Sequence, residues 1–306
     1  MATYDEAYAA SLEYYHGDDL AAKTFVDKYA LRDNEGDFKE TTPDDMHRRL
    51  AKEFARIEKK YPNPMSQEEI YNLLKDFRYV VPQGSPMSAI GNPYQVMSLS
   101  NCVVVESPKD SVESIIDTAK DMAQLYKRRC GVGCDMSNLR PEGMTVNNAA
   151  RTTTGAWSFA DFYSYVCRMI GQNSRRGALM LTMDVRHPDV YKFATMKRDK
   201  SKVKGANESI RINDEFMAAV RDDKSFTLQW PVDSPEPQMT QEIRARDLWE
   251  TVIESVHQGA EPGLLMWDNI TRELPAHYYP GFECVSTNPC SEIPLSELDA
   301  CRLNTV

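Results

Sequence analysis

Three side chains near the end of the sequence have types and a spacing that could support catalysis. Asn288, Cys290 and Glu292 stand at alternate positions in the segment Ser286-Thr-Asn-Pro-Cys-Ser-Glu-Ile-Pro-Leu295. Alternate side chains of an extended segment point to one side, so we expect these three on the same side of such a segment. Two more thiols, in Leu99-Ser-Asn-Cys102 and Asp299-Ala-Cys301-Arg-Leu, argue against a chance occurrence.

The seven cysteines limit the chemistry further. An odd number of cysteines, spread widely along the chain, is not typical of the disulfide framework of a secreted protein. Zinc needs paired Cys or His ligands at short spacing; only Cys130-Gly-Val-Gly-Cys134 comes near, so we predict no metal site. The thiols are therefore either buried apolar side chains or groups for redox or radical chemistry. They are Cys102, Cys130, Cys134, Cys167, Cys284, Cys290 and Cys301.

Two basic loops are conspicuous because the chain is acidic. Lys and Arg total 36 and Asp and Glu total 46, a formal charge of −10, which argues against direct nucleic-acid binding. A Lys-rich loop containing Gly suits a phosphate ligand, but a solvated charged loop explains it as well. The glycines complete no dinucleotide or P-loop motif. The loops are Arg175-Arg176-Gly177 and the run Lys197, Arg198, Lys200, Lys202, Lys204 and Gly205.

The elements that must position these residues form a helical region and then an α/β region. Pro43 after Thr42 opens one helix and a Ser66–Glu69 capping box opens another, so residues 1–80 are expected to be helical. From residue 99, strands alternate with helices, which favours a parallel sheet across 81–306. Expected strands are 99–105, 178–183, 209–212, 226–230 and 263–267, and expected helices are 110–126, 157–170, 188–196, 214–221 and 247–258.

The composition indicates a soluble intracellular globular protein. The apolar share of 42% suffices for a substantial core. The sequence contains no run of about 18 apolar residues for a membrane span and no secretory signal at its start, so we expect a cytoplasmic protein without membrane contact.

Several segments, taken in order, resemble the catalytic subunit of ribonucleotide reductases. The agreement extends over most of the chain, and agreement in order is more specific than any one segment. The match is closest to small, phage-like or adenosylcobalamin-type members. The segments are Pro82-Gln-Gly-Ser85, Ser100-Asn-Cys102, Arg128-Arg-Cys-Gly-Val-Gly133, Arg151-Thr-Thr-Thr-Gly155, Arg175-Arg-Gly-Ala178, Ser209-Ile-Arg-Ile-Asn-Asp-Glu-Phe-Met217 and Asn288-Pro-Cys-Ser-Glu292.

The resemblance implies a catalytic role for five residues. Cys290 stands at the family's finger-loop cysteine, whose thiyl radical abstracts the 3′-hydrogen of a ribonucleotide. Glu292 would be the general base at the 3′-hydroxyl, and Asn288 would position the substrate. Cys102 and Cys301 match the reducing pair that forms a disulfide at each turnover. Cys130, Cys134, Cys167 and Cys284 match no catalytic position and are expected in the core.

The resemblance also implies substrate and effector contacts. Ser100, Asn101 and the backbone at Gly131 and Gly133 would lie against the substrate. Asp110 is either a helix N-cap or the acid that holds the ribose of a dNTP or ATP effector, and the two roles can coexist. Effector and substrate-selecting loops would lie at 171–177 and 197–206, which gives a role to Arg175, Lys197, Lys202, Lys204 and Gly205.

The implied fold is a helical N-terminal region followed by the first half of a ten-stranded α/β barrel with a finger loop. We expect another chain to supply the C-terminal half, a homodimer, an external thiol reductant, and no N-terminal dATP switch. The radical would come from a metal-containing small subunit, slightly favoured, or from adenosylcobalamin. A non-catalytic nucleotide-binding regulator or a truncated piece of the same fold is the alternative. The phosphate level of the substrate stays open, and a phage protein would act in the host cytoplasm.

Overall fold

The computed structural model describes residues 2–170 and 177–306, and these form two compact units. The helical unit comprises residues up to Asn101 together with Arg302–Val306, and the sheet unit comprises 102–170 and 177–301. No helix in these parts of the chain is both long and apolar enough to cross a lipid bilayer.

The helical unit is built from capped amphipathic helices. Ser66 with Glu69 forms the capping box of α4 and Pro43 opens α3, as the sequence predicts, and the structure adds a capping box of Thr42 with Asp45. Leu50, Phe25 and Ile70 belong to its buried core. The elements are α1 (Tyr4–Tyr14), α2 (Asp19–Lys28), α3 (Pro43–Glu58), α4 (Gln67–Leu74), the 3₁₀ turn η1 (Lys75–Phe77), β1 (Val81–Pro82), α5 (Ser85–Ala89) and β12 (Asn304–Thr305), which pairs antiparallel with β1.

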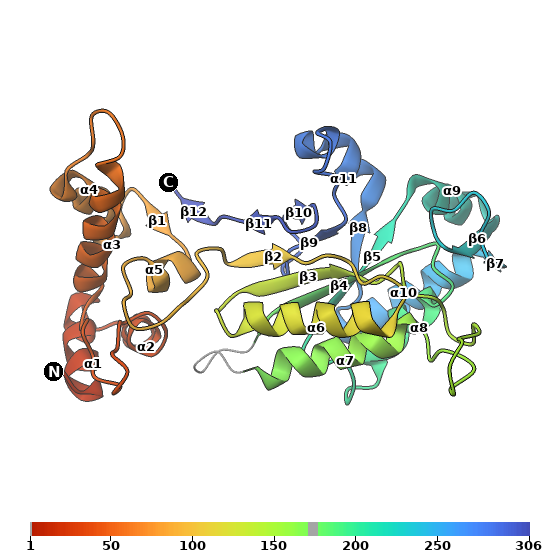
Figure 1. Cartoon of the computed structure of the whole chain (residues 1–306), viewed down its shortest axis with the longest axis horizontal. Helices are drawn as coiled ribbons and strands as arrows, with labels where there is room; N and C mark the ends of the chain where they lie inside the picture. Colours follow the sequence, from red (N-terminus) through yellow and green to blue (C-terminus); the bar gives the residue numbers. More distant parts are fainter. Residues whose placement is uncertain (1, 171–176) are drawn as a thin grey trace. The chain divides into compact units, whose positions relative to one another are not determined.

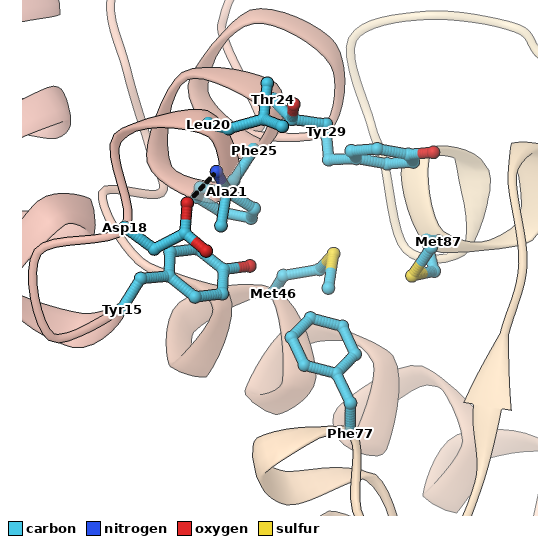
Figure 2. A pocket seen from close by; sticks show the side chains of 10 residues that line it. All are labelled: Tyr15, Asp18, Leu20, Ala21, Thr24, Phe25, Tyr29, Met46, Phe77 and Met87. Atoms are coloured by element: carbon cyan, nitrogen blue, oxygen red, sulfur yellow. Dashed lines mark hydrogen bonds between the residues drawn. The ribbon is translucent and has the colours of Figure 1, made fainter.

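The helical unit contains a cavity of about 340 Å³ that is partly open to solvent. Figure 2 shows the side chains of Tyr15, Met46 and Phe77 close to one another on one side and those of Tyr29 and Met87 beyond them. The lining is mostly apolar, and Asp18 enters it while accepting a hydrogen bond from the Ala21 amide at 3.0 Å. None of the residues that the sequence analysis assigned to a site lines this cavity.

The sheet unit is organised around six strands in the order β11-β2-β3-β4-β5-β8. Neighbours from β2 to β8 run parallel, and the edge strand β11 is antiparallel to β2. The alternation of strands and helices therefore predicted the parallel part correctly. The strands are β2 (Cys102–Val104), β3 (Gly131–Asp135), β4 (Leu179–Asp184), β5 (Asn207–Ile212), β8 (Gly263–Met266) and β11 (Ala300–Cys301).

Helices cover one face of this sheet, and a hairpin lies on the other. In Figure 1, α6 and α7 lie below the strands, with β9 and β10 above them. Met122, Tyr163 and Leu181 are fully buried in the core between helices and strands. The elements are α6 (Val112–Tyr126), α7 (Ala156–Met169), α8 (Val190–Thr195), α9 (Asp214–Asp222), α10 (Ala245–Gly259), α11 (Trp267–Glu273), the 3₁₀ turns η2 (Met196–Arg198) and η3 (Pro275–Tyr278), and the strands β9 (Ser286–Thr287) and β10 (Pro294–Leu295).

Two local expectations were wrong. The predicted strand 226–230 lies outside the parallel sheet, because β6 (Ser225–Trp230) pairs antiparallel with β7 (Met239–Arg244) in a separate hairpin. Asp110 is not the N-cap of α6, because Ser111 takes that position and accepts the Ser114 amide at 3.2 Å. A Ser at N-cap satisfies a free amide as well as an Asp does, so the neighbouring Asp is free for other contacts.

Candidate active site

The finger hairpin, residues 286–295, carries Cys290 at its tip. Strands β9 and β10 pair antiparallel, and the Asn288 amide donates to Ile293 O at 3.1 Å. The Ser291 amide donates to Asn288 O at 3.0 Å, and Ser291 has φ 72°. The tip is thus a tight turn rather than the extended segment that we expected. A turn is favoured because the side-chain oxygen of Asn288 accepts the Ile293 amide at 3.1 Å and closes it.

The finger hairpin lies directly on β3 because that strand has glycines where the two approach. A Cβ at Gly133 would lie 1.9 Å from Thr287 O, and one at Gly131 would lie 2.9 Å from Pro289 Cγ. Strand β9 also contacts β3 and β4. The two glycines, which we expected against a substrate, therefore have the finger hairpin as their protein neighbour.

Cys102 and Cys301 face each other across two strands. They are directly paired residues of β2 and β11, and both are free thiols buried to 9% and 2% exposure. Opposite residues of an antiparallel pair have Cα atoms about 4.5 or 5.5 Å apart, within the range of about 4.4–6.8 Å that a disulfide spans. The two thiols are hydrogen-bonded to each other, and this contact together with burial raises the pKa of Cys102.

Cys290 and Glu292 complete this cluster. Cys290 is exposed, whereas the other six cysteines are buried. Desolvation, together with the nearby charges of Glu292 and Cys301, raises the pKa of the Cys290 thiol. The thiol therefore stays protonated at neutral pH, and the structure brings Cys290, Glu292 and Cys301 within electrostatic reach of one another.

Asn288 is fully buried at the base of the tip. Its Oδ1 is used within the hairpin, and its Nδ2 has no hydrogen-bond partner among the residues that the structure describes. A buried amide donor without a partner is costly, so it is a natural donor for a ligand.

A polar network beneath the hairpin was missed by the sequence analysis. Asp135 of β3 and Thr182 of β4 are buried, and Arg211 of β5 is partly buried, on the sheet face that carries the hairpin. Strand alternation was the available signal, because Arg211 stands between Ile210 and Ile212 of the helix-facing core.

Asp110 is held by an arginine. Its Oδ2 lies 2.6 Å from Arg140 Nε, and its Oδ1 accepts the Arg140 backbone amide at 3.0 Å. The pair is partly exposed just before α6. This position combines a carboxylate, a guanidinium and a helix N-terminus.

The Lys-rich loop is tied to the sheet unit at several points. Lys197 Nζ donates to Ala206 O at 2.7 Å and pairs with Glu261. The Gly205 amide donates to Ser164 Oγ at 2.8 Å. Lys202 lies 5.2 Å from the Trp157 ring centre, and the side chains of Lys202 and Lys204 are exposed. Arg175 lies outside the described residues.

Ser100 and Asn101 belong to the helical unit. Asn101 Oδ1 accepts the Ser85 amide at 2.7 Å, and its Nδ2 donates to Gln83 O at 3.1 Å. The Ser100 amide donates to Ser98 Oγ at 3.0 Å. The Asn101 side chain therefore fastens the 83–85 segment.

Comparison with known protein families agrees with this architecture. Residues 100–306 match the family described as ribonucleotide reductase, barrel domain, and residues 15–91 match ribonucleotide reductase, all-alpha domain. The chain belongs to the ribonucleotide reductase family. The helical unit and the half-barrel sheet agree with the fold that the sequence resemblance implied.

Individual ribonucleotide reductases show the same relationship. A vitamin B12-dependent ribonucleoside-diphosphate reductase of Mycobacterium tuberculosis (strain CDC 1551 / Oshkosh) is 30% identical over 294 residues, 94% of this chain and 41% of the relative. A namesake from Thermoplasma acidophilum is 32% identical over 210 residues, 68% of this chain and 27% of the relative. The large subunit of a variola virus ribonucleoside-diphosphate reductase is 24% identical over 267 residues, 78% of this chain and 34% of the relative. The chain thus spans less than half of each relative.

Proposed function

We propose that this chain is the N-terminal part of a ribonucleotide reductase catalytic subunit that reduces ribonucleotides to 2′-deoxyribonucleotides. The observation that carries the proposal is the pairing of Cys102 with Cys301 beside the exposed Cys290. Two electrons are needed to replace a 2′-hydroxyl by hydrogen, and two opposed thiols within disulfide reach supply them.

In the proposed reaction, each of these residues has a distinct role. Cys290, as a thiyl radical, takes the 3′-hydrogen of the ribose and later returns it. Glu292 accepts the proton of the 3′-hydroxyl, and the unpartnered Nδ2 of Asn288 holds the substrate in place. The 2′-hydroxyl leaves as water with a proton from the pair, and Cys102 and Cys301 become a disulfide. An external thiol reductant restores them.

The radical source that we propose to test first is adenosylcobalamin, because the relatives at 30% and 32% identity are named vitamin B12-dependent. The residue of this chain that suits adenosylcobalamin is Cys290. Its thiol is exposed, and its raised pKa keeps the S–H bond intact at neutral pH. When bound, adenosylcobalamin would supply an organic radical able to take that hydrogen atom. A metal-containing small subunit is the other source, and assays with and without adenosylcobalamin separate them.

We propose a dNTP or ATP effector site at Asp110 and Arg140, near a dimer interface formed by α6 and α7. The carboxylate suits ribose hydroxyls, and the guanidinium with the helix N-terminus suits phosphates. The two helices pack on each other, and each leaves large apolar side chains more than half exposed. These are Val112 and Ile116 on α6, and Tyr165 and Met169 on α7. The exposed Lys202 and Lys204 would join the loop that selects the substrate.

The activity requires the remainder of the barrel, in the same or another chain. In the described part of the chain, β8 and β11 each lack a partner strand on their outer side. Relatives are more than twice as long as the matched region. Further strands at these edges would complete the barrel and enclose the substrate.

The test is Cys290→Ala in the completed enzyme. We expect turnover to fall below detection while deoxynucleotide effector binding is unchanged. Cys134→Ala, on the helix-facing side of β3, is the matched control and should retain activity. Full turnover of the Cys290→Ala enzyme would overturn the radical assignment. Effector binding without turnover in the parent enzyme, under either radical source, would instead indicate a non-catalytic regulator.

A further inference from the structure

We propose that Arg211, Asp135 and Thr182 are positioning residues that set the finger hairpin, and hence Cys290, at a fixed place over the sheet. The inference rests on the proposed function for its catalytic meaning, but its structural content is independent of it. None of the three was among the site residues expected from the sequence.

Arg211 joins the sheet to the base of the hairpin. Its Nη1 donates to Val285 O at 3.1 Å, the carbonyl immediately before β9. Its Nε lies 3.3 Å from Asp135 Oδ2, and its Nη2 donates to Ser137 Oγ at 3.2 Å. The guanidinium also lies 4.9 Å from the centre of the Trp267 ring. A planar group held on several sides has one orientation, so the backbone it binds is also fixed.

Thr182 provides a second connection to the hairpin. Its hydroxyl donates to Asp135 Oδ2 at 2.8 Å and lies 2.9 Å from Ser286 Oγ. A hydroxyl has a single hydrogen, so Ser286 must donate to Thr182, and the donors run from Ser286 through Thr182 to Asp135. Thr182 and Ser286 are fully buried. Asp135 therefore receives both connections, one from Arg211 and one from Thr182.

Asn207 holds the other side of the hairpin. Its Nδ2 donates to Pro289 O at 2.8 Å, the carbonyl directly before Cys290. With the close approach of Thr287 to Gly133, the hairpin is held at its base, along its strand and next to the thiol. These contacts come from β3, β4 and β5, so three strands of the sheet jointly determine the position of Cys290.

The network of Arg211, Asp135 and Thr182 differs from other ion pairs of the sheet unit because it contacts the finger hairpin. Arg186 offers the comparison, because it pairs with Asp184 and Asp233 at 2.8 Å each. Among the described residues, the hydrogen bonds that Arg186 donates go to Asp184 and Asp233 and to no residue of 285–290. Arg186 meets the network through Asp184, whose Oδ2 also lies 3.7 Å from Arg211 Nη2. A smaller effect on the hairpin is therefore expected from Arg186 than from Arg211 or Thr182.

The test compares Thr182→Val with Thr182→Ser. Valine keeps the shape and removes the hydroxyl, whereas serine keeps the hydroxyl. We expect Thr182→Val and Arg211→Gln to speed amide hydrogen exchange at Asn288, Ser291 and Ile293 at least tenfold, and Thr182→Ser to restore slow exchange. Arg186→Gln is the matched control and should change exchange at these amides far less than Arg211→Gln does.

A second readout follows Cys290 itself. Because Cys290 is the exposed cysteine of the seven, the rate of its alkylation by iodoacetamide reports on the hairpin tip. We expect that rate to change at least threefold in Thr182→Val, and kcat of the completed enzyme to fall with little change in KM. Folded Thr182→Val and Arg211→Gln proteins with parental exchange and alkylation rates would overturn the inference. Loss of activity on Cys290→Ala tests the proposed function separately.

Discussion

At the scale of single residues, Glu208 is a buried carboxylate on the helix-facing side of β5. It is 1% exposed, and neither carboxylate oxygen has a hydrogen-bond partner among the described residues. Burial raises its pKa to about 8, with Lys197 opposing and Glu261 reinforcing the shift. The folded protein therefore holds this proton more tightly than the unfolded chain does.

This linkage predicts a pH dependence of stability. The usual pKa is 4.5, so the free energy of unfolding should fall as pH rises from about 4.5 to about 8. Glu208→Gln removes the titration. At about 1.4 kcal/mol per pKa unit, the free energy of unfolding of the variant should exceed that of the parent by at least about 2 kcal/mol above pH 8 and match it below about pH 4.5. Urea unfolding across pH measures this; equal pH profiles for parent and variant would contradict it, and Glu215→Gln is an exposed control.

Variants at Asp110 and Ser111 should distinguish effector binding from helix capping. Asp110→Ala should weaken deoxynucleotide binding by about 1 kcal/mol or more, the scale of a charge-assisted hydrogen bond. Ser111→Ala removes the N-cap of α6 and should cost about 1 kcal/mol of stability without changing effector affinity. Calorimetric titration and thermal melts measure both. An Asp110→Ala protein with parental effector affinity would remove the effector assignment.

At the scale of elements, the sequence predicted the regular parts and missed the turns and the second sheet. The Thr42-Pro43 start, the capping box at Ser66 and apolar periodicity located the helices because these signals are local. Strand β3 was not predicted as a strand, because Gly131-Val-Gly133 has low strand propensity and its glycines are explained only by the hairpin lying against them. Contacts between segments more than 150 residues apart leave no local trace.

The closeness of hairpin and strand predicts an overpacking effect. Gly133→Ala places a Cβ against the Thr287 carbonyl and should cost about 1–3 kcal/mol or displace the hairpin. Gly259→Ala is the control, since a Cβ there meets nothing within 4 Å. Chemical denaturation with amide exchange of the hairpin measures the effect. Equal stability and exchange for both variants would show that the hairpin yields without cost.

At the scale of the whole molecule, sequence and structure agree on a helical unit followed by a half-barrel sheet. The candidate site was predictable in part. Cys102, Cys290, Glu292 and Cys301 could be named from motifs, and the structure brings them together. The support from Arg211 and Thr182 could not be named, since it depends on three strands meeting one hairpin.

Self-association is predicted at the exposed apolar side chains of α6 and α7. Ile116→Lys should shift the protein from dimer to monomer in sedimentation and weaken effector binding, because a charge there cannot be buried. Ile253→Lys, on α10, is the control for adding a charge at an exposed isoleucine and should leave the dimer intact. A parent that is monomeric at all concentrations would contradict the interface.

The glycines of β3 also have a consequence for how the gene can vary. Positions 131 and 133 face the finger hairpin and have no room for a side chain, whereas Val132 and Cys134 face the helices and need only fill volume. Saturation mutagenesis of this strand should therefore give tolerance with a period of two. Positions 131 and 133 should reject substitutions, whereas positions 132 and 134 should accept them. A strand that needed only to be buried on both faces would not show this alternation.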